Sequence, residues 1–311
     1  MKKISLFVLL VVISASLIAC NSEEESNANG DTISVGYAIN TLDNPFFVDV
    51  KEAAEEEAKA KGIQISVVNA NEDLSEQMSG IEDLIQKQVD VIILDPVDSE
   101  GSSAAVNTAN EANIPVITTG RTVDEGEVVT HMGYDEVKNG ETAGDYLAEK
   151  LNEEGKVVEI QGTPGADTAK MRSEGFNKAM EKYPNIEVVA TQSADFDRTK
   201  GLDVTEDILQ SNSDIDGLYA ANDEMGLGAL QAIKSANLDG IVIVSNDGTK
   251  DAFKAIEEGD LSGTMSVSPQ AYGEKAVEIA LKVANGEKQE KEIELPSEFI
   301  SQENLKDALN E

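Results

Sequence analysis

The residues best suited to binding chemistry are aromatic and polar side chains that directly follow apolar, strand-like runs. Phe46 and Phe47 follow one such run and Phe196 another, while Asn222 and Asp247 follow two more. Such rings can cover the apolar C–H faces of a sugar, and amide or carboxylate groups can bond its hydroxyls. The alternatives are ordinary ones: two of the three rings belong to the core, and Asn222 and Asp247 cap helices.

The chain contains only three arginines, and every other basic residue is lysine. Arg121 follows the run PVITTG, Arg172 lies in a helical stretch after GTPGADTAK, and Arg198 opens another helix. A rigid guanidinium fork suits a site that must bond two acceptors at once. Surface ion pairs are the alternative for each arginine, most of all for Arg198. If Arg172 lines a cleft, its replacement should weaken binding and change folding little.

Signatures of catalysis are absent from the sequence. It contains no G-x-S-x-G, P-loop, H-E-x-x-H or EF-hand motif, and no G-x-G-x-x-G after the first strand. The single histidine, His131, lies in the apolar run VVTHMG, where we expect a structural role. Met225 begins a helical stripe that is typical of core packing. We therefore expect a protein that is not an enzyme and has no metal site and no cofactor.

Composition restricts the partners of this chain. Its 311 residues include 60 Asp and Glu against 24 Lys and Arg, for a formal net charge of −36. A surface this acidic repels phosphate backbones, so we expect no nucleic-acid partner. Hydrophobic residues make up 40% of the chain, which is enough for sizeable cores. The length favours two lobes over one.

The N-terminal residues have the pattern of a bacterial secretion signal. Lys2 and Lys3 precede an uncharged apolar run that is short for a transmembrane helix. The only cysteine, Cys20, follows Leu-Ile-Ala, and this tetrad resembles the lipobox, in which the cysteine is lipidated and becomes the first residue. We expect a signal peptide at 1–19 and a lipid-anchored flexible tether at 20–30. The protein would then be extracytoplasmic, on the outer face of the cell membrane or periplasmic; an ordinary signal with an incidental cysteine is the alternative.

Apolar, β-branched runs alternate with helical patterns along the rest of the chain. Asn44 and Pro45 suit the cap and first turn of a helix that continues to Lys61 and is ended by Gly62. Strands that alternate with helices of this length predict right-handed βαβ units, parallel sheets, and ligands at the carboxyl ends of strands. About ten strands exceed one comfortable sheet, so we expect an α/β fold of two doubly wound lobes. The runs lie at 33–39, 63–68, 91–94, 116–118, 128–132, 157–160, 188–190, 217–220, 241–244 and 261–267.

Six ordered strings resemble the ribose-binding family of type I periplasmic substrate-binding proteins, which serve ATP-driven importers. They are TLDNPFF (41–47), ILDPVDS (93–99), ANIPVIT (112–118), GDYLA (144–148), QSADFDRTKGL (192–202) and ANDEMGLGAL (221–230). The similarity extends from about Thr32 to about residue 290. It implies two lobes joined by three crossovers and closing around one monosaccharide. The implied bounds are 31–134 plus 268–296 for lobe one and 135–267 plus 297–311 for lobe two.

The resemblance also implies the residues that contact the ligand. Transferred motif by motif, the sugar contacts of the family fall on Asn44, Phe46, Phe47, Asp95, Arg121, Arg172, Phe196, Asn222 and Asp247. Four positions depart from the family pattern. The family has Asn where this chain has Asp95, Asp where it has Gly120, and Phe where it has Asn246. Near the position of Val267 the family has a Gln. The frame of a sugar site is therefore expected, with altered specificity.

The implied function is that of the substrate-binding component of a sugar importer. It would bind a ribose-like monosaccharide or a polyol, close around it and deliver it to a membrane permease, and we expect it to be a monomer. A ligand-sensing ectodomain, for a sugar or an autoinducer-type signal, that docks a membrane signalling receptor is the alternative that uses the same body. A sugar-responsive repressor also shares this body, but it would begin with a helix-turn-helix where the secretion signal stands here.

Overall fold

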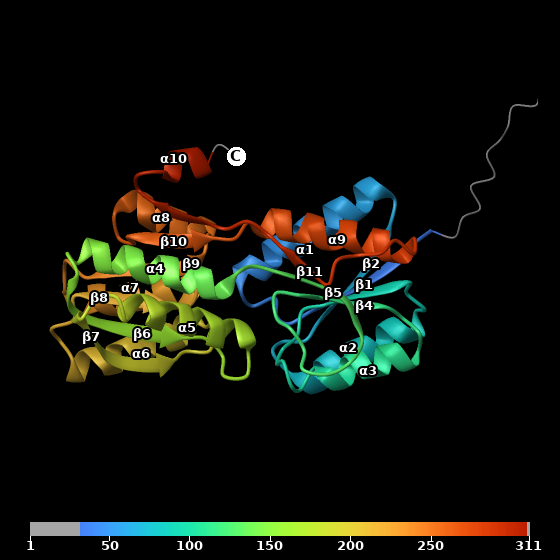
Figure 1. The fold of residues 1–311 in the computed structure, drawn as a ribbon, viewed down its shortest axis with the longest axis horizontal. Helices are drawn as coiled ribbons and strands as arrows, with labels where there is room; N and C mark the ends of the chain where they lie inside the picture. The colour runs from blue at the N-terminus through green and yellow to red at the C-terminus, as the bar shows by residue number, and fades with distance from the viewer. Residues whose placement is uncertain (1–31, 310–311) are drawn as a thin grey trace, which may run out of the picture. The chain divides into compact units, whose positions relative to one another are not determined.

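A computed structural model describes residues 32–309, and the expected signal peptide and the whole expected tether, with Cys20, lie outside them (Figure 1). The described chain contains two six-stranded sheets, with the strand orders β11-β5-β4-β3-β1-β2 and β12-β10-β9-β8-β6-β7. All neighbouring strands are parallel except β12, which pairs antiparallel to β10. The expected α/β fold of two doubly wound lobes is confirmed.

The first sheet is covered by helices on both faces (Figure 1). Its strands are β1 (Ser34–Ile39), β2 (Gln64–Asn69), β3 (Val91–Leu94), β4 (Val116–Thr119), β5 (Val128–Gly133) and β11 (Glu292–Glu294). Helices α1 (Pro45–Lys61) and α9 (Pro269–Ala284) pack on one face, and α2 (Leu74–Gln86) and α3 (Ser103–Glu111) on the other. Because β3 is buried on both faces, all four of its residues are apolar.

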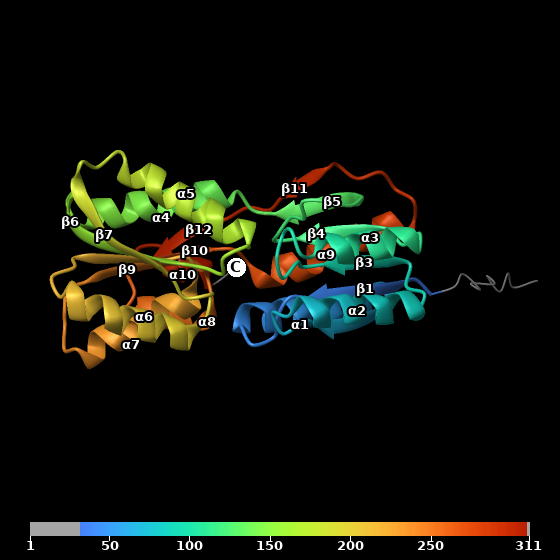
Figure 2. The same ribbon diagram turned by 90° about the horizontal axis from the view of Figure 1, so that it is seen from below.

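The second sheet has the same layered plan (Figure 2). Its strands are β6 (Glu154–Gln161), β7 (Asn185–Ser193), β8 (Gly217–Ala220), β9 (Val242–Asp247), β10 (Gly263–Ser266) and β12 (Glu298–Ser301). Helices α4 (Glu136–Lys150) and α5 (Asp167–Met180) pack on one face. The opposite face carries α6 (Arg198–Ser211), α7 (Asp223–Ser235), α8 (Lys250–Glu258) and the short α10 (Leu305–Ala308).

The chain passes from one sheet to the other three times: between β5 and α4, between β10 and α9, and between β11 and β12. Neither β11 nor β12 was expected from the sequence. Both are short, and β11 reads Glu-Ile-Glu, so neither offers the apolar run by which the other strands were recognised. Among residues 32–309, no helix has both the length and the apolar character needed to cross a membrane.

Local sequence fixes the helix that presents the aromatic pair. The side chain of Asn44 accepts a hydrogen bond from the Phe46 amide at 2.9 Å, and Pro45 occupies the first turn. Gly62 forms the C-cap, so the expected bounds of α1 are confirmed. Because α1 begins just after β1, this cap places Phe46 and Phe47 at the carboxyl edge of the first sheet.

Candidate functional site

A cavity lies among loops that follow the carboxyl ends of strands in both sheets. This position is the one expected for the ligand site of parallel α/β sheets. All nine ligand contacts expected from the sequence line it: Asn44, Phe46, Phe47, Asp95, Arg121, Arg172, Phe196, Asn222 and Asp247. The fold therefore gathers side chains that are up to about two hundred residues apart in sequence.

Aromatic rings are concentrated around this cavity. The chain has seven Phe, six Tyr and no Trp, and five of these rings line the cavity: Phe46, Phe47, Tyr134, Phe196 and Tyr272. Phe46 meets Phe47 edge to face at 5.2 Å between ring centroids and meets Tyr272 in the same way at 6.0 Å. Tyr134 stacks on Tyr272 at 6.1 Å. These contacts fix the ring orientations and form an apolar wall suited to the C–H faces of a ligand.

Arg172 forms the centre of a network of polar contacts that lines the cavity from the second lobe. Its Nε donates to Glu136 Oε2 at 2.7 Å and its Nη2 to Glu136 Oε1 at 3.0 Å, while Nη1 donates to the Ala221 carbonyl at 2.7 Å. Asp247 Oδ1 lies 3.4 Å from Nη1. Burial by itself would lower the pKa of Arg172, but Glu136 and Asp247 raise it above its usual range, so the side chain stays charged.

Arg121 is held from the side of the first sheet. Its Nη1 donates to the carbonyls of Pro96 and Val97, at 3.1 and 2.6 Å. Its guanidinium carbon lies 5.7 Å from the centroid of the Phe196 ring, and that of Arg172 lies 5.9 Å from the same centroid. Phe196 therefore lies within cation–π distance of an arginine from each lobe.

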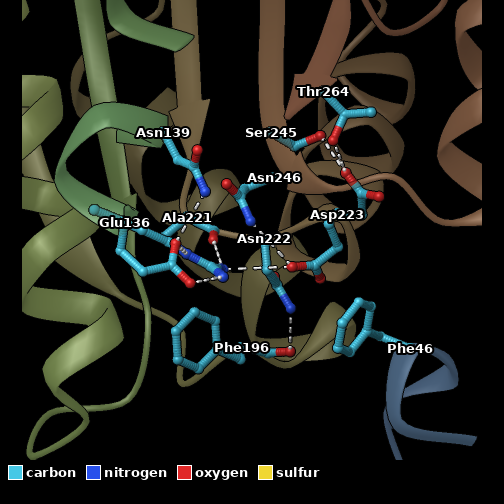
Figure 3. A network of polar contacts seen from close by, with 12 residues as sticks. Phe46, Glu136, Asn139, Phe196, Ala221, Asn222, Asp223, Ser245, Asn246 and Thr264 are labelled. Atoms are coloured by element: carbon cyan, nitrogen blue, oxygen red, sulfur yellow. Dashed lines mark hydrogen bonds and ion pairs between the residues drawn. The ribbon is translucent and has the colours of Figure 1, made fainter. Parts of the chain in front are cut away.

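Asn222 has both of the roles that the sequence left open, as a helix cap and as a residue of the cavity wall. It caps α7, because its Oδ1 accepts from the Met225 amide at 2.9 Å, and it also lines the cavity. Its Nδ2 donates to the Phe196 carbonyl at 3.1 Å, which holds that loop in place (Figure 3). Phe196 and Asp247 both have positive φ, at 60° and 135°, a strained state that usually persists where surrounding contacts enforce it.

Two of the carboxyl groups in the cavity are hard to ionise. Burial raises the pKa of Asp95 to about 7; Arg121 opposes the shift and Asp167 adds to it. Burial also raises the pKa of Asp247, against the effect of Arg172. Behind Asp247, the fully buried Asp223 accepts hydrogen bonds from Ser245, Thr249 and Thr264 at 2.6 to 2.9 Å. That carboxylate is fully occupied and does not line the cavity.

Several contacts join elements of the two lobes around the cavity. Asp167 Oδ2 at the start of α5 accepts from the Thr122 amide at 2.9 Å and also from the Thr122 hydroxyl. The Ser99 amide donates to the Gly165 carbonyl at 3.3 Å. On another side, Lys250 pairs with Asp49 at 3.0 Å. The described conformation is therefore one in which the lobes touch each other.

Six further polar or aromatic residues that were not expected from the sequence line the cavity: Thr41, Glu72, Tyr134, Glu136, Thr168 and Tyr272. Tyr134 and Glu136 directly follow β5, so the strand-end rule, applied to that strand as well, would have found them. Tyr272 had no such signal, because it lies in the first turns of α9.

Three other residues have the structural roles that we expected. Arg198 pairs with Glu224 and Asp251 and is partly exposed. His131 bonds Thr118 through Nδ1 at 3.0 Å, and burial lowers its pKa. Met225 is fully buried in the core. In residues 32–309 no group of three or more His, Cys, Asp or Glu side chains is arranged to hold a metal ion.

The chain is similar to known binding proteins in sequence and in fold. A periplasmic binding protein domain matches residues 35–288. The ribose import binding protein of Bacillus subtilis (strain 168) is 40% identical over 308 residues, covering 97% of this chain and all of the relative. The ribose import binding protein of Escherichia coli (strain K12) is 38% identical over 288 residues, covering 93% of this chain and 94% of that protein. An ABC transporter solute-binding protein from Bacillus halodurans C-125, solved with bound myo-inositol, superimposes with a TM-score of 0.85 at 32% identity, covering 90% of this chain and 98% of that one.

Proposed function

This chain belongs to the periplasmic binding protein family, and from that premise we propose that its cavity binds one neutral monosaccharide or polyol. The protein is the extracytoplasmic substrate-binding component of an ABC-type sugar importer, and it is not an enzyme. Its partners are a sugar-type ligand and the membrane permease of that importer. The observation that carries the ligand proposal is the cavity itself, where five aromatic rings face charged and hydrogen-bonding groups from both lobes.

The charges around the cavity favour a neutral ligand over an anionic one. Four carboxyl groups line it, from Glu72, Asp95, Glu136 and Asp247, against the two guanidinium groups of Arg121 and Arg172. Glu136 already occupies two donors of Arg172. A sugar acid or sugar phosphate would therefore compete with Glu136 for the donors of Arg172, and its charge would be buried at a high cost in a low-dielectric cavity.

We propose that binding closes lobe one (31–134 plus 268–296) onto lobe two (135–267 plus 297–311). The lobe-to-lobe contacts around Asp167 and Asp49 belong to a closed state, and a ligand touching both lobes binds that state better than an open one. We also propose that the protein is a monomer, anchored to the outer face of the membrane by lipid on Cys20. The LIAC tetrad after an apolar run supports the anchor, since acyl chains contribute about 0.8 kcal/mol per buried methylene.

A thermal-shift and calorimetry panel tests the ligand proposal. Ribose, arabinose, allose, xylitol and myo-inositol are titrated into the purified protein, with gluconate and ribose 5-phosphate as anionic controls. We expect at least one neutral compound to stabilise the protein, by roughly 2.7 kcal/mol at a hundred times its Kd, and the two anions to have no effect. Stabilisation by an anion alone, or by none of a wide panel of neutral sugars and polyols, would contradict the proposal.

A further inference from the structure

Three polar atoms of residues that line the cavity are buried and have no hydrogen-bond partner in the described part of the chain. They are Asp95 Oδ2, Tyr134 Oη and Tyr272 Oη, all from elements of the first lobe. Buried polar atoms in folded proteins nearly always have a partner. Other buried polar atoms of residues 32–309 also have no partner, among them both side-chain atoms of Asn40. It is the position of these three, in residues that line one wall of the cavity, that points to a ligand as the missing partner.

Tyr272 is held rigidly in this wall. Its ring lies between those of Phe46 and Tyr134, and only 2% of the residue is exposed. The next residue, Gly273, has no side chain because α9 approaches the backbone of α1 at Val50 so closely that a Cβ would not fit. The close helix packing and the two ring contacts thus determine where the Tyr272 hydroxyl points.

Gly120 shares its space with Tyr272. It has a φ of +67°, and a Cβ at this position would lie 2.7 Å from Tyr272 Oη and 3.7 Å from Asp95 Oδ1. Any larger residue at position 120 would therefore collide with the tyrosine hydroxyl. At this end of the cavity the tyrosine hydroxyl, and not a side chain from position 120, forms the polar surface beside Asp95.

We propose that the Tyr272 hydroxyl, beside the expected contact Asp95, determines the specificity of the site by binding a hydroxyl group at one end of a neutral sugar or polyol. The Tyr272 hydroxyl donates a hydrogen bond to the ligand, and Asp95 Oδ2 accepts one from it. The proposal rests on the proposed function. Burial and the nearby Asp95 raise the pKa of Tyr272 well above its usual value, so its hydroxyl remains a donor.

A purely structural role for the Tyr272 hydroxyl is the competing explanation. The Thr119 hydroxyl lies beside the hydroxyls of both Tyr37 and Tyr272, although none of these three hydroxyl groups has a hydrogen-bond partner of good geometry. Tyr37 provides a matched control, because its hydroxyl is also fully buried, close to Asp95 and without a partner. Unlike Tyr272, it does not line the cavity.

The test combines protein variants with ligand analogues. The tightest neutral binder among ribose, arabinose, allose, xylitol and myo-inositol, and each of its monodeoxy analogues, are titrated calorimetrically into wild type, Tyr272→Phe and Tyr37→Phe, all as the full purified protein. We expect Tyr272→Phe to weaken binding of the parent compound about tenfold, which is one net hydrogen bond. It should also remove most of the discrimination against one deoxy analogue, whereas Tyr37→Phe should preserve that discrimination.

Gly120→Ala gives a second measurement that leaves Tyr272 in place. The added methyl group must displace the hydroxyl, so it should weaken binding strongly in wild type and much less in the Tyr272→Phe background. Equal effects in both backgrounds, or an unchanged deoxy ratio in a folded Tyr272→Phe protein, would overturn the specificity proposal. Failure of wild type to bind any neutral compound would count instead against the proposed function, so the two failures are distinguishable.

Discussion

Arg172 and Glu136 form a two-point ion pair in the wall of the cavity, with Nε to Oε2 at 2.7 Å and Nη2 to Oε1 at 3.0 Å. Only 8% of Arg172 is exposed and only 3% of Glu136. The guanidinium therefore serves the fold as well as the site, because it neutralises Glu136 and lies beside Asp247. This changes the expectation from sequence that Arg172 could be replaced with little effect on folding.

We predict that Arg172→Ala destabilises the free protein by about 3–5 kcal/mol, because it leaves Glu136 buried without its counter-charge. Arg198→Ala is the matched control: Arg198 makes the same two-point contact with Glu224, but its side chain is 39% exposed. Because Glu224 is itself buried but Arg198 is partly exposed, this variant should lose clearly less stability than Arg172→Ala. Denaturant unfolding of both variants compares them, and equal losses would show that burial of the Arg172 pair does not matter.

Asp95 should give the free protein an unusual pH dependence. Its pKa of about 7 in the folded state lies above that of an unfolded aspartate, about 3.9, so the folded state retains a proton between these values. The stability contributed by this group is therefore present below pH 4 and lost as the pH rises to about 7. We predict that Asp95→Asn becomes progressively more stable relative to wild type between pH 5 and pH 8. If the difference in the free energy of unfolding between Asp95→Asn and wild type stays constant from pH 5 to pH 8, the raised pKa of Asp95 is contradicted.

Asp167 should affect affinity without touching the ligand. It accepts two hydrogen bonds from Thr122 across the lobes and does not line the cavity. Asp167→Ala should lower the population of the closed state and weaken sugar binding about tenfold, since apparent affinity scales with that population. Small-angle scattering should show less compaction at a given ligand concentration.

Asp73→Ala is the control for this prediction, because Asp73 caps α2 within one lobe, by accepting from Ser75 and Glu76. It should lower stability and leave affinity unchanged. If Asp73→Ala and Asp167→Ala weaken binding equally, the effect is one of general stability and not of lobe closure.

The anchor proposal predicts the behaviour of Cys20→Ser. Removing the only thiol of the chain should release the protein from the membrane fraction or leave its signal uncleaved. Ser22→Ala, two residues further along, should process and fractionate like wild type. A Cys20→Ser protein that matures normally and stays on the membrane would exclude lipidation at this residue.

The sequence by itself determined the fold class and most of the candidate site. Strands in buried parallel sheets are rich in apolar residues, so ten of the twelve described strands could be recognised from their apolar runs in the sequence. Residues that follow such strands gather at one edge of a sheet, as Phe46, Asn222 and Asp247 do. The helix from Pro45 to Lys61 was predicted with its correct bounds, because caps are local in sequence.

Only the tertiary structure decided how these side chains are used. Tyr272 lies inside a helix, and its direction depends on the packing of α9 against α1, which no local pattern encodes. The pairing of Arg172 with Glu136, and the space that Gly120 leaves for the Tyr272 hydroxyl, join residues that are 36 and about 150 positions apart. Such contacts depend on how elements that are far apart in sequence pack within each lobe. Side-chain orientation and burial, which set charge and specificity, are fixed only at that level.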